Sequence, residues 1–286
     1  MQHNNTRIYS SESAFKSWAS FRSLFFDNWS QAVYLGKQIA FRDLKTKYRQ
    51  TILGFAWLFI PVLITTALFV FMNHYKVINA GETVLPYFLY AFTGTLFWQL
   101  FSESVLSPMQ IFNQSKAMIT KIQFPKEALI IASGVQIMVN FMVKLAVVLP
   151  VVWLMGYGME WSVLLVPVAA LALIFLGLLI GLLLTPLNML YNDVLMAVQS
   201  LLTLLVFTVP AGFKPAEGSS LESVMNANPL SIVISSARDF LTTGWDGHHD
   251  ALMNIIALIG VASILYFMAF LIIRTILPIV TERLSA

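Results

Sequence analysis

The feature that most constrains this chain is a series of long apolar stretches that hold almost no charge. A helix needs roughly 20 apolar residues to cross about 30 Å of hydrocarbon. Stretches of about that length occur six times, with approximate bounds 54–73, 83–102, 128–155, 161–184, 194–213 and 251–273. The sequence therefore predicts an all-α membrane protein with six transmembrane helices.

The composition agrees with a protein embedded in lipid. The 286-residue chain is 58% hydrophobic and 11% charged, whereas soluble domains are about 45–50% apolar and about 25% charged. It has no cysteine, which excludes disulfides and cysteine-based metal or nucleophile sites. Residues 1–30 are polar and lack the apolar core of a signal peptide. We expect them to form an N-terminal extension, and the first span to act as the insertion signal.

The distribution of Lys and Arg predicts the orientation, because cytoplasmic loops of membrane proteins are enriched in both. Basic residues gather before the first span, between the second and third spans and in the C-terminal tail. The loops on the other side hold only Lys76, Lys214 and Arg238. Both termini are therefore predicted to lie in the cytoplasm.

Residues 31–50 predict an amphipathic helix ahead of the first span. Arg42, Lys45 and Arg49 cluster on one side of the helical wheel. The opposite face is apolar and aromatic, and consists of Val33, Tyr34, Ala40, Phe41, Leu44 and Tyr48. We expect this helix to lie at the membrane surface, with its basic side toward lipid phosphates and cytosol. The alternative is that the basic residues only fix the orientation of the first span.

Two segments outside the spans carry helix or turn signals. The cytoplasmic segment 116–129, KAMITKIQFPKEAL, is predicted to hold a short helix at the membrane surface, with Pro125 separating it from the third span. On the other side, 228–241 has an apolar stripe at helical spacing, and Pro229 fits the first position of a helix. The run 209–215, VPAGFKP, predicts a turn that folds back toward the membrane. The fifth loop is therefore expected to contain short amphipathic or re-entrant elements.

The sequence offers little enzyme chemistry within the membrane. The histidines lie outside the spans or at their edges, and no HExxH motif occurs. The run 245–250, WDGHHD, is interpreted as a solvated loop, so no metal site is predicted. A Walker A motif is absent, so an ATP-driven activity requires a separate ATP-binding subunit.

Two features inside the predicted spans need an explanation. Lys144 is the one charge deep within a span, and Asn140 shares its helical face. Either the two line a polar cavity, or the lysine extends outward to solvent or bonds a neighbouring carbonyl. Gly177 and Gly181 form a GxxxG pattern, which predicts close helix packing within the bundle.

A set of short motifs follows in order from about residue 31 to the C-terminus. They are KYRQTILGFAWLFIPVL (47–63), FTGTLFWQLF (92–101), KIQFPKEAL (121–129), YNDV (191–194) and NPLSIVISSAR (228–238). In this order they resemble the membrane subunits of bacterial ABC exporters for surface polysaccharides: O-antigen, teichoic acid and capsule. Asp193-Val194 favours the O-antigen branch. Asn192 departs from the arginine frequent at that place in the branch, so a salt bridge by that arginine is not expected.

The resemblance implies a homodimeric permease that works with two copies of a separate ATPase subunit. ATP and Mg²⁺ would bind to the ATPase, and this chain would carry no cofactor. The substrate would be a lipid-linked polysaccharide, with O-antigen favoured over capsular polysaccharide or teichoic acid, and it would cross the bacterial inner membrane. Helix 31–50 would lie at the membrane interface, in contact with membrane lipids, beside the point where the glycan enters. A permease domain would follow at 51–286.

The resemblance also assigns roles to particular segments. Segment 108–126 would couple the permease to the ATPase, chiefly through Lys121, Phe124, Pro125 and Lys126. Segment 213–240 would form short gate helices on the outer side. The residues expected at this outer gate are Pro210, Asn228, Pro229 and Arg238.

A hydrated polymer needs a path that is neither fully apolar nor strongly charged, and aromatic rings suit sugars because pyranose C–H groups stack on them. We expect Trp57, Phe59, Phe97 and Trp98 to line this channel. The alternative for these aromatic residues is ordinary helix packing and an interfacial belt. Pro61 is expected to kink the first span and help it to rearrange.

Two other classes of function stay open at this point. A membrane-embedded transferase for lipid-linked sugars needs carboxylates near a basic access point, and this chain supplies few. A non-catalytic scaffold is disfavoured by the long fifth loop and the charged second loop. Nothing in the sequence points to nucleic acid as a partner.

Overall fold

The computed structural model describes residues 29–49, 51–78, 85–122, 124–157, 160–215, 218–242 and 249–285. Over these residues the chain consists of helices and turns without a strand, which confirms the predicted all-α class. The predicted N-terminal extension lies outside the described residues except for its last two positions. Most of the run 245–250 also lies outside them.

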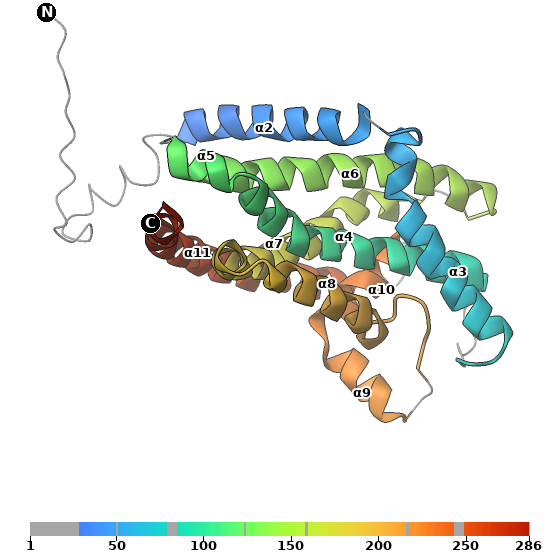
Figure 1. Ribbon diagram of the computed structural model, residues 1–286. Helices are drawn as coiled ribbons and strands as arrows, with labels where there is room; N and C mark the ends of the chain where they lie inside the picture. The colour runs from blue at the N-terminus through green and yellow to red at the C-terminus, as the bar shows by residue number, and fades with distance from the viewer. Residues whose placement is uncertain are drawn as a thin grey trace, which may run out of the picture.

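The helices follow one another with short connections (Figure 1). Their order is α2 (Trp29–Arg49), η1 (Gly54–Leu58), α3 (Ile60–His74), α4 (Tyr87–Gln114), α5 (Lys116–Lys121), α6 (Glu127–Leu154), η2 (Trp161–Leu165), α7 (Val166–Leu190), α8 (Asp193–Leu205), η3 (Val206–Thr208), α9 (Ser220–Ala227), α10 (Pro229–Thr242) and α11 (His249–Ser285). Each of the six predicted spans coincides with one or more of these helices.

Length and hydropathy separate these helices into groups. Within the described residues, three helical stretches are long and apolar enough to cross a membrane: Glu127–Leu154, Trp161–Leu190 and Leu252–Leu271. The apolar helices Ile60–His74 and Asp193–Thr208 are shorter. The count of six spans is therefore not established by helix length and composition, and it stays a prediction.

The core of the molecule is the contact between α4 and α7, the most extensive between any two elements in the described chain. In Figure 1, α4 passes through the middle of the bundle with α7 behind it. A Cβ on Gly181 would lie 2.2 Å from the Val105 carbonyl oxygen, and one on Gly177 would lie 2.5 Å from the Ser104 Cβ. Only glycine allows the two backbones to come so close. The GxxxG pattern of α7 thus packs within the bundle, as predicted.

The predicted amphipathic segment forms α2, which runs side by side with the first half of α6 (Figure 1). The closest approach is at Gly36, where a Cβ would meet the Ala128 carbonyl oxygen at 2.7 Å. Of the predicted apolar face, Ala40, Leu44 and Tyr48 are buried by this contact, along with Ala32 and Ile39. Tyr34 and Phe41, also predicted for that face, stay exposed. The location of α2 at a membrane surface stays a prediction.

Pro61 does not kink the first apolar helix. It is the second residue of α3, within the first turn, where no intrahelical partner is needed for a backbone N–H. The chain before it, Gly54–Leu58, forms the separate 3₁₀ helix η1. The expectation of a kink was wrong because the helix begins at the proline instead of passing through it.

The glycine contact can be tested by adding one methyl group. Gly181→Ala should lower the free energy of unfolding by about 1–3 kcal/mol, because the Cβ overlaps a carbonyl oxygen that the helix backbone holds in place. Gly260→Ala is the control, since no atom outside its own helix lies within 4 Å of the added Cβ. It should raise stability by up to about 1 kcal/mol through helix propensity. Thermal unfolding of the purified variants in detergent measures both, and equal effects at the two positions would contradict the assignment.

Candidate functional site

The segment predicted to couple to an ATPase joins the ends of α4 and α6. The helix α4 continues to Gln114, so the first part of the predicted segment 108–126 extends the second apolar helix. The short helix α5 follows and ends at Lys121, and α6 begins only at Glu127. Pro125 lies in the interruption between these helices, as predicted. The loop–helix–loop thus ends two long helices at one end of the bundle (Figure 1).

The residues named for coupling differ in exposure. Lys121 is exposed, whereas Phe124, Pro125 and Lys126 are half-buried. Burial lowers the pKa of Lys126, and the neighbouring carboxylate of Glu127 opposes this shift. Phe124 packs beneath the segment on a small cluster formed by α2, α4, α5, α6, α7 and α11. Movement of this segment therefore acts directly on the packing of several helices.

A hydrogen bond that the sequence did not predict ties α5 to the fourth loop. Lys116 Nζ donates to Asn192 Oδ1 at 3.0 Å. Asn192 is the residue that departs from the arginine of the O-antigen branch. Partial burial lowers the pKa of Lys116. The two positions are 76 residues apart, so no local pattern indicates the contact.

A polar cluster lies between α2, α4 and α6, around the lysine that the sequence singled out. Lys144 has no exposed surface, and its Nζ contacts Glu103 Oε1 at 2.6 Å. Four residues earlier on α6, Asn140 Oδ1 accepts a hydrogen bond from the Tyr48 hydroxyl at 3.1 Å. Lys144 therefore neither extends to solvent nor bonds a carbonyl. Its partner is the carboxylate at the end of the second predicted span.

A row of polar residues runs along the half-exposed side of α4 and gives it a composition unlike that of the other long helices. The buried side chains of α4 are mostly apolar, whereas its half-exposed side chains include several polar ones. The half-exposed polar residues are Gln99, Ser102, Glu103, Ser107, Gln110 and Asn113, and we call them the α4 polar row. Two buried oxygens of this row, Gln99 Oε1 and Glu103 Oε2, accept no hydrogen bond.

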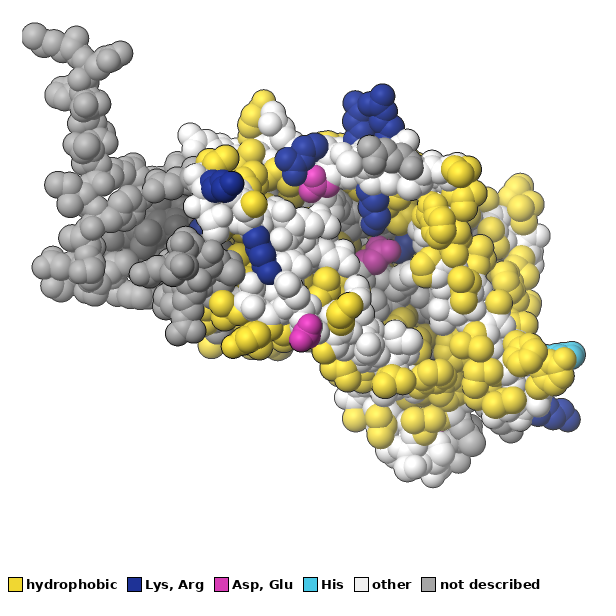
Figure 2. Space-filling view, in the orientation of Figure 1, with side chains coloured by type: hydrophobic (Ala, Val, Ile, Leu, Met, Phe, Trp, Pro, Cys, Tyr) yellow, Lys and Arg dark blue, Asp and Glu magenta, His cyan; other side chains and the backbone are white. Residues whose placement is uncertain are grey.

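The helix α8, which contacts α4, has a second polar row. Leu202 is the one buried residue on it. Gln199, Ser200 and Thr203 are exposed together on one flank, and we call them the α8 polar row. Leu201, Leu204 and Leu205 are exposed on the other flank. Figure 2 shows one face of the molecule, where polar and charged groups gather in the upper and middle part, and hydrophobic side chains cover the right and lower parts.

The four predicted gate residues lie along two contacts between α10 and the residues 208–211. Asn228 Nδ2 donates to the Thr208 carbonyl oxygen at 3.4 Å, and its Oδ1 accepts from the Leu230 amide at 3.0 Å. Pro229 is the first residue of α10, as predicted. Arg238, buried on the same helix, donates to the Pro210 carbonyl oxygen. The segment is more deeply packed than an amphipathic surface helix, since α10 contacts α4, α7 and α11.

The four aromatic residues predicted for a channel do not share one environment. Trp57 is exposed and Phe59 is half-buried, near the start of α3. Phe97 has no exposed surface and Trp98 is buried with its ring beside Phe101. In the single chain, Phe97 and Trp98 are core residues, and their role in a channel stays a prediction. The sequence analysis favoured aromatic residues and did not predict the two polar rows. Helical spacing of the polar residues in 99–113 would have indicated the α4 polar row.

The sequence is similar to those of proteins named as permeases of O-antigen export systems. This similarity confirms the predicted resemblance to polysaccharide exporter permeases. The chain is 29% identical over 202 residues to the O-antigen export system permease protein RfbA of Myxococcus xanthus, which covers 68% of this chain and 75% of the relative. It is 23% identical over 210 residues to a Klebsiella pneumoniae protein of the same name, covering 71% and 78%. No protein-family model matches the chain.

The ion pair predicts an asymmetric response to mutation. Glu103→Gln leaves the fully buried Lys144 cation without its partner and should lower stability by about 2 kcal/mol or more. Lys144→Met should cost less, because the Glu103 side chain retains 26% exposure and can be hydrated. The double variant should recover part of the loss caused by Glu103→Gln, since it leaves no isolated charge.

Thermal unfolding in detergent gives the double-mutant cycle, with the exposed Lys45→Met as the control for loss of a lysine. Additive effects of the two single substitutions would mean that the ion pair contributes no coupling energy.

Proposed function

We propose that this chain is the membrane-spanning permease subunit of an ATP-driven exporter, and that it moves lipid-linked O-antigen across the bacterial inner membrane. The observation that carries this proposal is the similarity over 202 residues to a relative named as an O-antigen export permease. Capsular polysaccharide and teichoic acid are the alternative substrates. A transferase is less well supported, because Glu103, a carboxylate inside the bundle, is engaged by Lys144.

The two polar rows give a physical reason for transport. Amide and charged side chains within apolar helices face water or other polar groups, because lipid offers them no hydrogen bonds. The hydroxyls of Ser102, Ser200 and Thr203 also bond carbonyls of their own helices. The rows of α4 and α8 consist mainly of amides and hydroxyls. Such groups bond sugar hydroxyls without holding them by charge. Lys144 neutralises Glu103 of the α4 row, so a neutral glycan meets little net charge there.

The proposed topology has six spans with both termini in the cytoplasm. At 1.5 Å per residue, α3 is about 22 Å long, which is less than the thickness of the hydrocarbon core. A short span is accommodated by local thinning of the bilayer or by association with another helix. The outward faces of α3 and α8 expose several large apolar residues. The short length of α3 supports a homodimer in which it packs against a second copy, and the exposed apolar residues are compatible with contact to lipid or to that copy.

Coupling to ATP hydrolysis is assigned to α5 and the residues after it. ATP and Mg²⁺ would bind to two copies of a separate ATPase subunit, and Lys121, Phe124, Pro125 and Lys126 would meet that subunit at the membrane surface. The support is geometric: α5 lies at the end of α4, and Lys116 links it to Asn192 at the start of α8. Displacement of α5 would therefore move both helices that carry polar rows.

The coupling assignment predicts a loss of docking after charge reversal. Lys121→Glu with Lys126→Glu should lower co-purification of the ATPase subunit at least severalfold, because the substitutions reverse the charge of the proposed docking surface and disturb the half-buried site of Lys126. The control is Lys76→Glu, which reverses the charge of an exposed lysine far from α5 in the sequence. If the first variant co-purifies with the ATPase and exports glycan at the normal rate, α5 is not the docking element.

The α8 polar row predicts a loss of export without loss of assembly. Gln199→Leu with Thr203→Leu removes two exposed hydrogen-bonding groups and should lower the export rate severalfold while co-purification of the ATPase is unchanged. Leu201→Val with Leu205→Val is the control on the opposite exposed flank, and it should export normally. Surface O-antigen, measured by pulse-labelling of whole cells, gives the rate. Normal export by the Gln199 and Thr203 variant would exclude this row from the path.

A further inference from the structure

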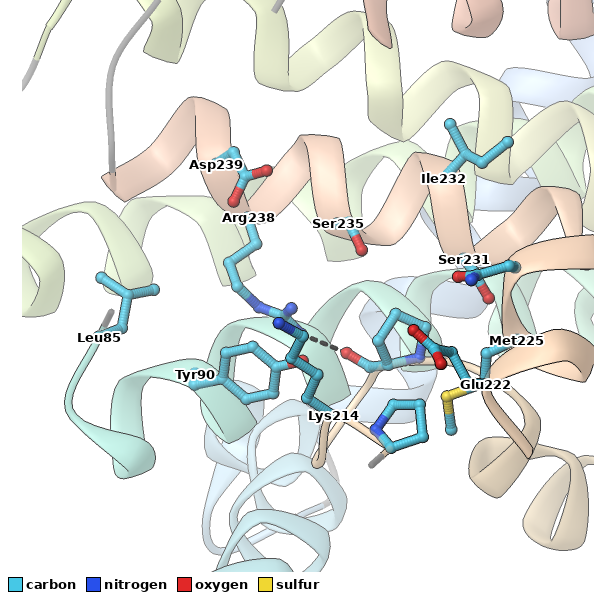
Figure 3. A pocket seen from close by; sticks show the side chains of 13 residues that line it. Leu85, Tyr90, Lys214, Glu222, Met225, Ser231, Ile232, Ser235, Arg238 and Asp239 are labelled. Carbon is cyan, nitrogen blue, oxygen red and sulfur yellow. Dashed lines mark hydrogen bonds between the residues drawn. The ribbon is translucent and has the colours of Figure 1, made fainter. Parts of the chain in front are cut away.

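A cavity of about 470 Å³ opens between α9, α10, the turn after η3 and the beginning of α4 (Figure 3). It is near Tyr90, whereas α5 follows the other end of α4, about 36 Å away along the helix at 1.5 Å per residue. The polar residues that matter for the argument are Lys214, Glu222, Ser231, Ser235, Arg238 and Asp239. The cavity therefore lies at the end of the bundle opposite to the predicted coupling segment.

Two buried polar atoms of the cavity lining lack a hydrogen-bond partner. Ser231 is 6% exposed and Arg238 is 3% exposed, yet Ser231 Oγ and Arg238 Nε make no hydrogen bond. Buried polar atoms almost always have a partner, and leaving one without costs about 1–3 kcal/mol. Both residues line the same cavity. A ligand in the cavity could supply the missing partners after a small shift of these side chains.

The arginine is held in place by the protein and is not free to turn away. Its guanidinium lies over the Tyr90 ring, 3.7 Å from the ring centroid. One terminal nitrogen donates to the carbonyl oxygens of Pro210 and Ala211. Figure 3 shows the Arg238 side chain extended beside Tyr90, with Lys214 below it. The guanidinium beside the cavity is therefore already ordered, which lowers the entropic cost of binding a ligand there.

The balance of charge selects the class of ligand. Lys214 and Arg238 are matched by Glu222 and Asp239, so the lining has no net charge and gives no advantage to phosphate or carboxylate. Hydroxyls at Ser231 and Ser235 stand beside these charged groups, and Glu222 itself accepts from the Gly218 amide at 2.6 Å. Donors and acceptors set among apolar side chains such as Leu85, Met225 and Ile232 suit a compact neutral ligand that has both hydroxyls and C–H faces.

We propose that this cavity binds one neutral pyranose unit of the glycan as it emerges on the outer side. That the bound sugar belongs to the exported glycan rests on the proposed function. The preference for a neutral pyranose rests on the lining of the cavity alone. Binding there holds the leading part of the polymer outside the bundle and opposes its return while the ATPase resets. Because α10 bears Ser231, Ser235 and Arg238 and also contacts α4 and α7, an occupied cavity stabilises this packing.

Ligand binding is measured on the purified full chain in lauryldimethylamine oxide, since sugar-based detergents would compete. The probes are methyl α-D-mannopyranoside and methyl α-D-galactopyranoside in saturation-transfer NMR, and inorganic phosphate in ³¹P line-width measurements. At least one pyranoside should receive saturation from the protein, and phosphate should show no broadening. Failure of both pyranosides to bind, or broadening of phosphate in their place, overturns the proposal.

Substitutions then locate the site. Ser235→Phe fills the cavity and should weaken pyranoside binding at least tenfold, and Ser231→Ala, which removes an unpaired hydroxyl with little change in volume, should weaken it severalfold. Ser223→Phe on α9 is the matched control, because Ser223 is exposed and does not line the cavity. Thermal unfolding checks that each variant is folded. Undiminished binding by both Ser231→Ala and Ser235→Phe places the ligand elsewhere and overturns the proposal.

Export in cells separates this inference from the proposed function. If deletion of the gene leaves surface O-antigen unchanged, the proposed function is wrong, and the pyranoside measurements still decide the cavity's chemistry. If deletion abolishes export, Ser235→Phe should lower the export rate severalfold with normal ATPase co-purification. Loss of pyranoside binding with a normal export rate would show that the cavity serves free sugar, and would overturn the link to the exported chain.

Discussion

The close backbone contact between α4 and α7 is the interaction around which the rest of the molecule is arranged. In a bilayer, apolar burial gives little preference for one helix partner over another, so packing that brings backbones together decides which helices associate. Gly177 and Gly181 supply that packing against Phe101 and Val105. With α7 on one side, α4 is held so that a different side carries its polar row. The position of α4 then determines where Tyr90 and Glu103 lie.

Several polar features along α4 are spread over its length instead of forming one site. Near its beginning, Tyr90 supports Arg238 beside the outer cavity. In its middle, Glu103 pairs with Lys144. Its last residue, Gln114, is followed directly by Ser115 and α5. A single continuous helix, interrupted in its hydrogen bonding only by Pro108, thus connects the segment proposed to meet the ATPase with the cavity proposed to hold sugar.

Much of the fold was predictable because membrane helices follow simple local rules. Each apolar stretch in the sequence became a helix, Pro229 began α10, and Pro125 separated α5 from α6. These features depend on hydrophobicity and on the missing N–H of proline, both of which are visible in a short window. Pro61 was misjudged because the same residue ends, kinks or begins a helix according to which neighbouring turns form.

The candidate site was less predictable, because its contacts join residues far apart in the chain. Lys144 was recognisable as a buried charge, but its partner Glu103 is 41 residues away. Arg238 was assigned to a gate, whereas its contact with Pro210 and its position over Tyr90 required the packed bundle. Phe97 and Trp98 were assigned to a channel by residue type, and the bundle buried both.

The sequence by itself determined the helical class, the approximate positions of the helices and the similarity to O-antigen export permeases. Those properties follow from composition and spacing along one dimension. The tertiary structure alone decided which polar groups are paired, which are exposed in rows, and which line a cavity. The physical reason is that burial and hydrogen bonding depend on the neighbour across a helix interface, and here that neighbour is commonly tens of residues distant in the chain.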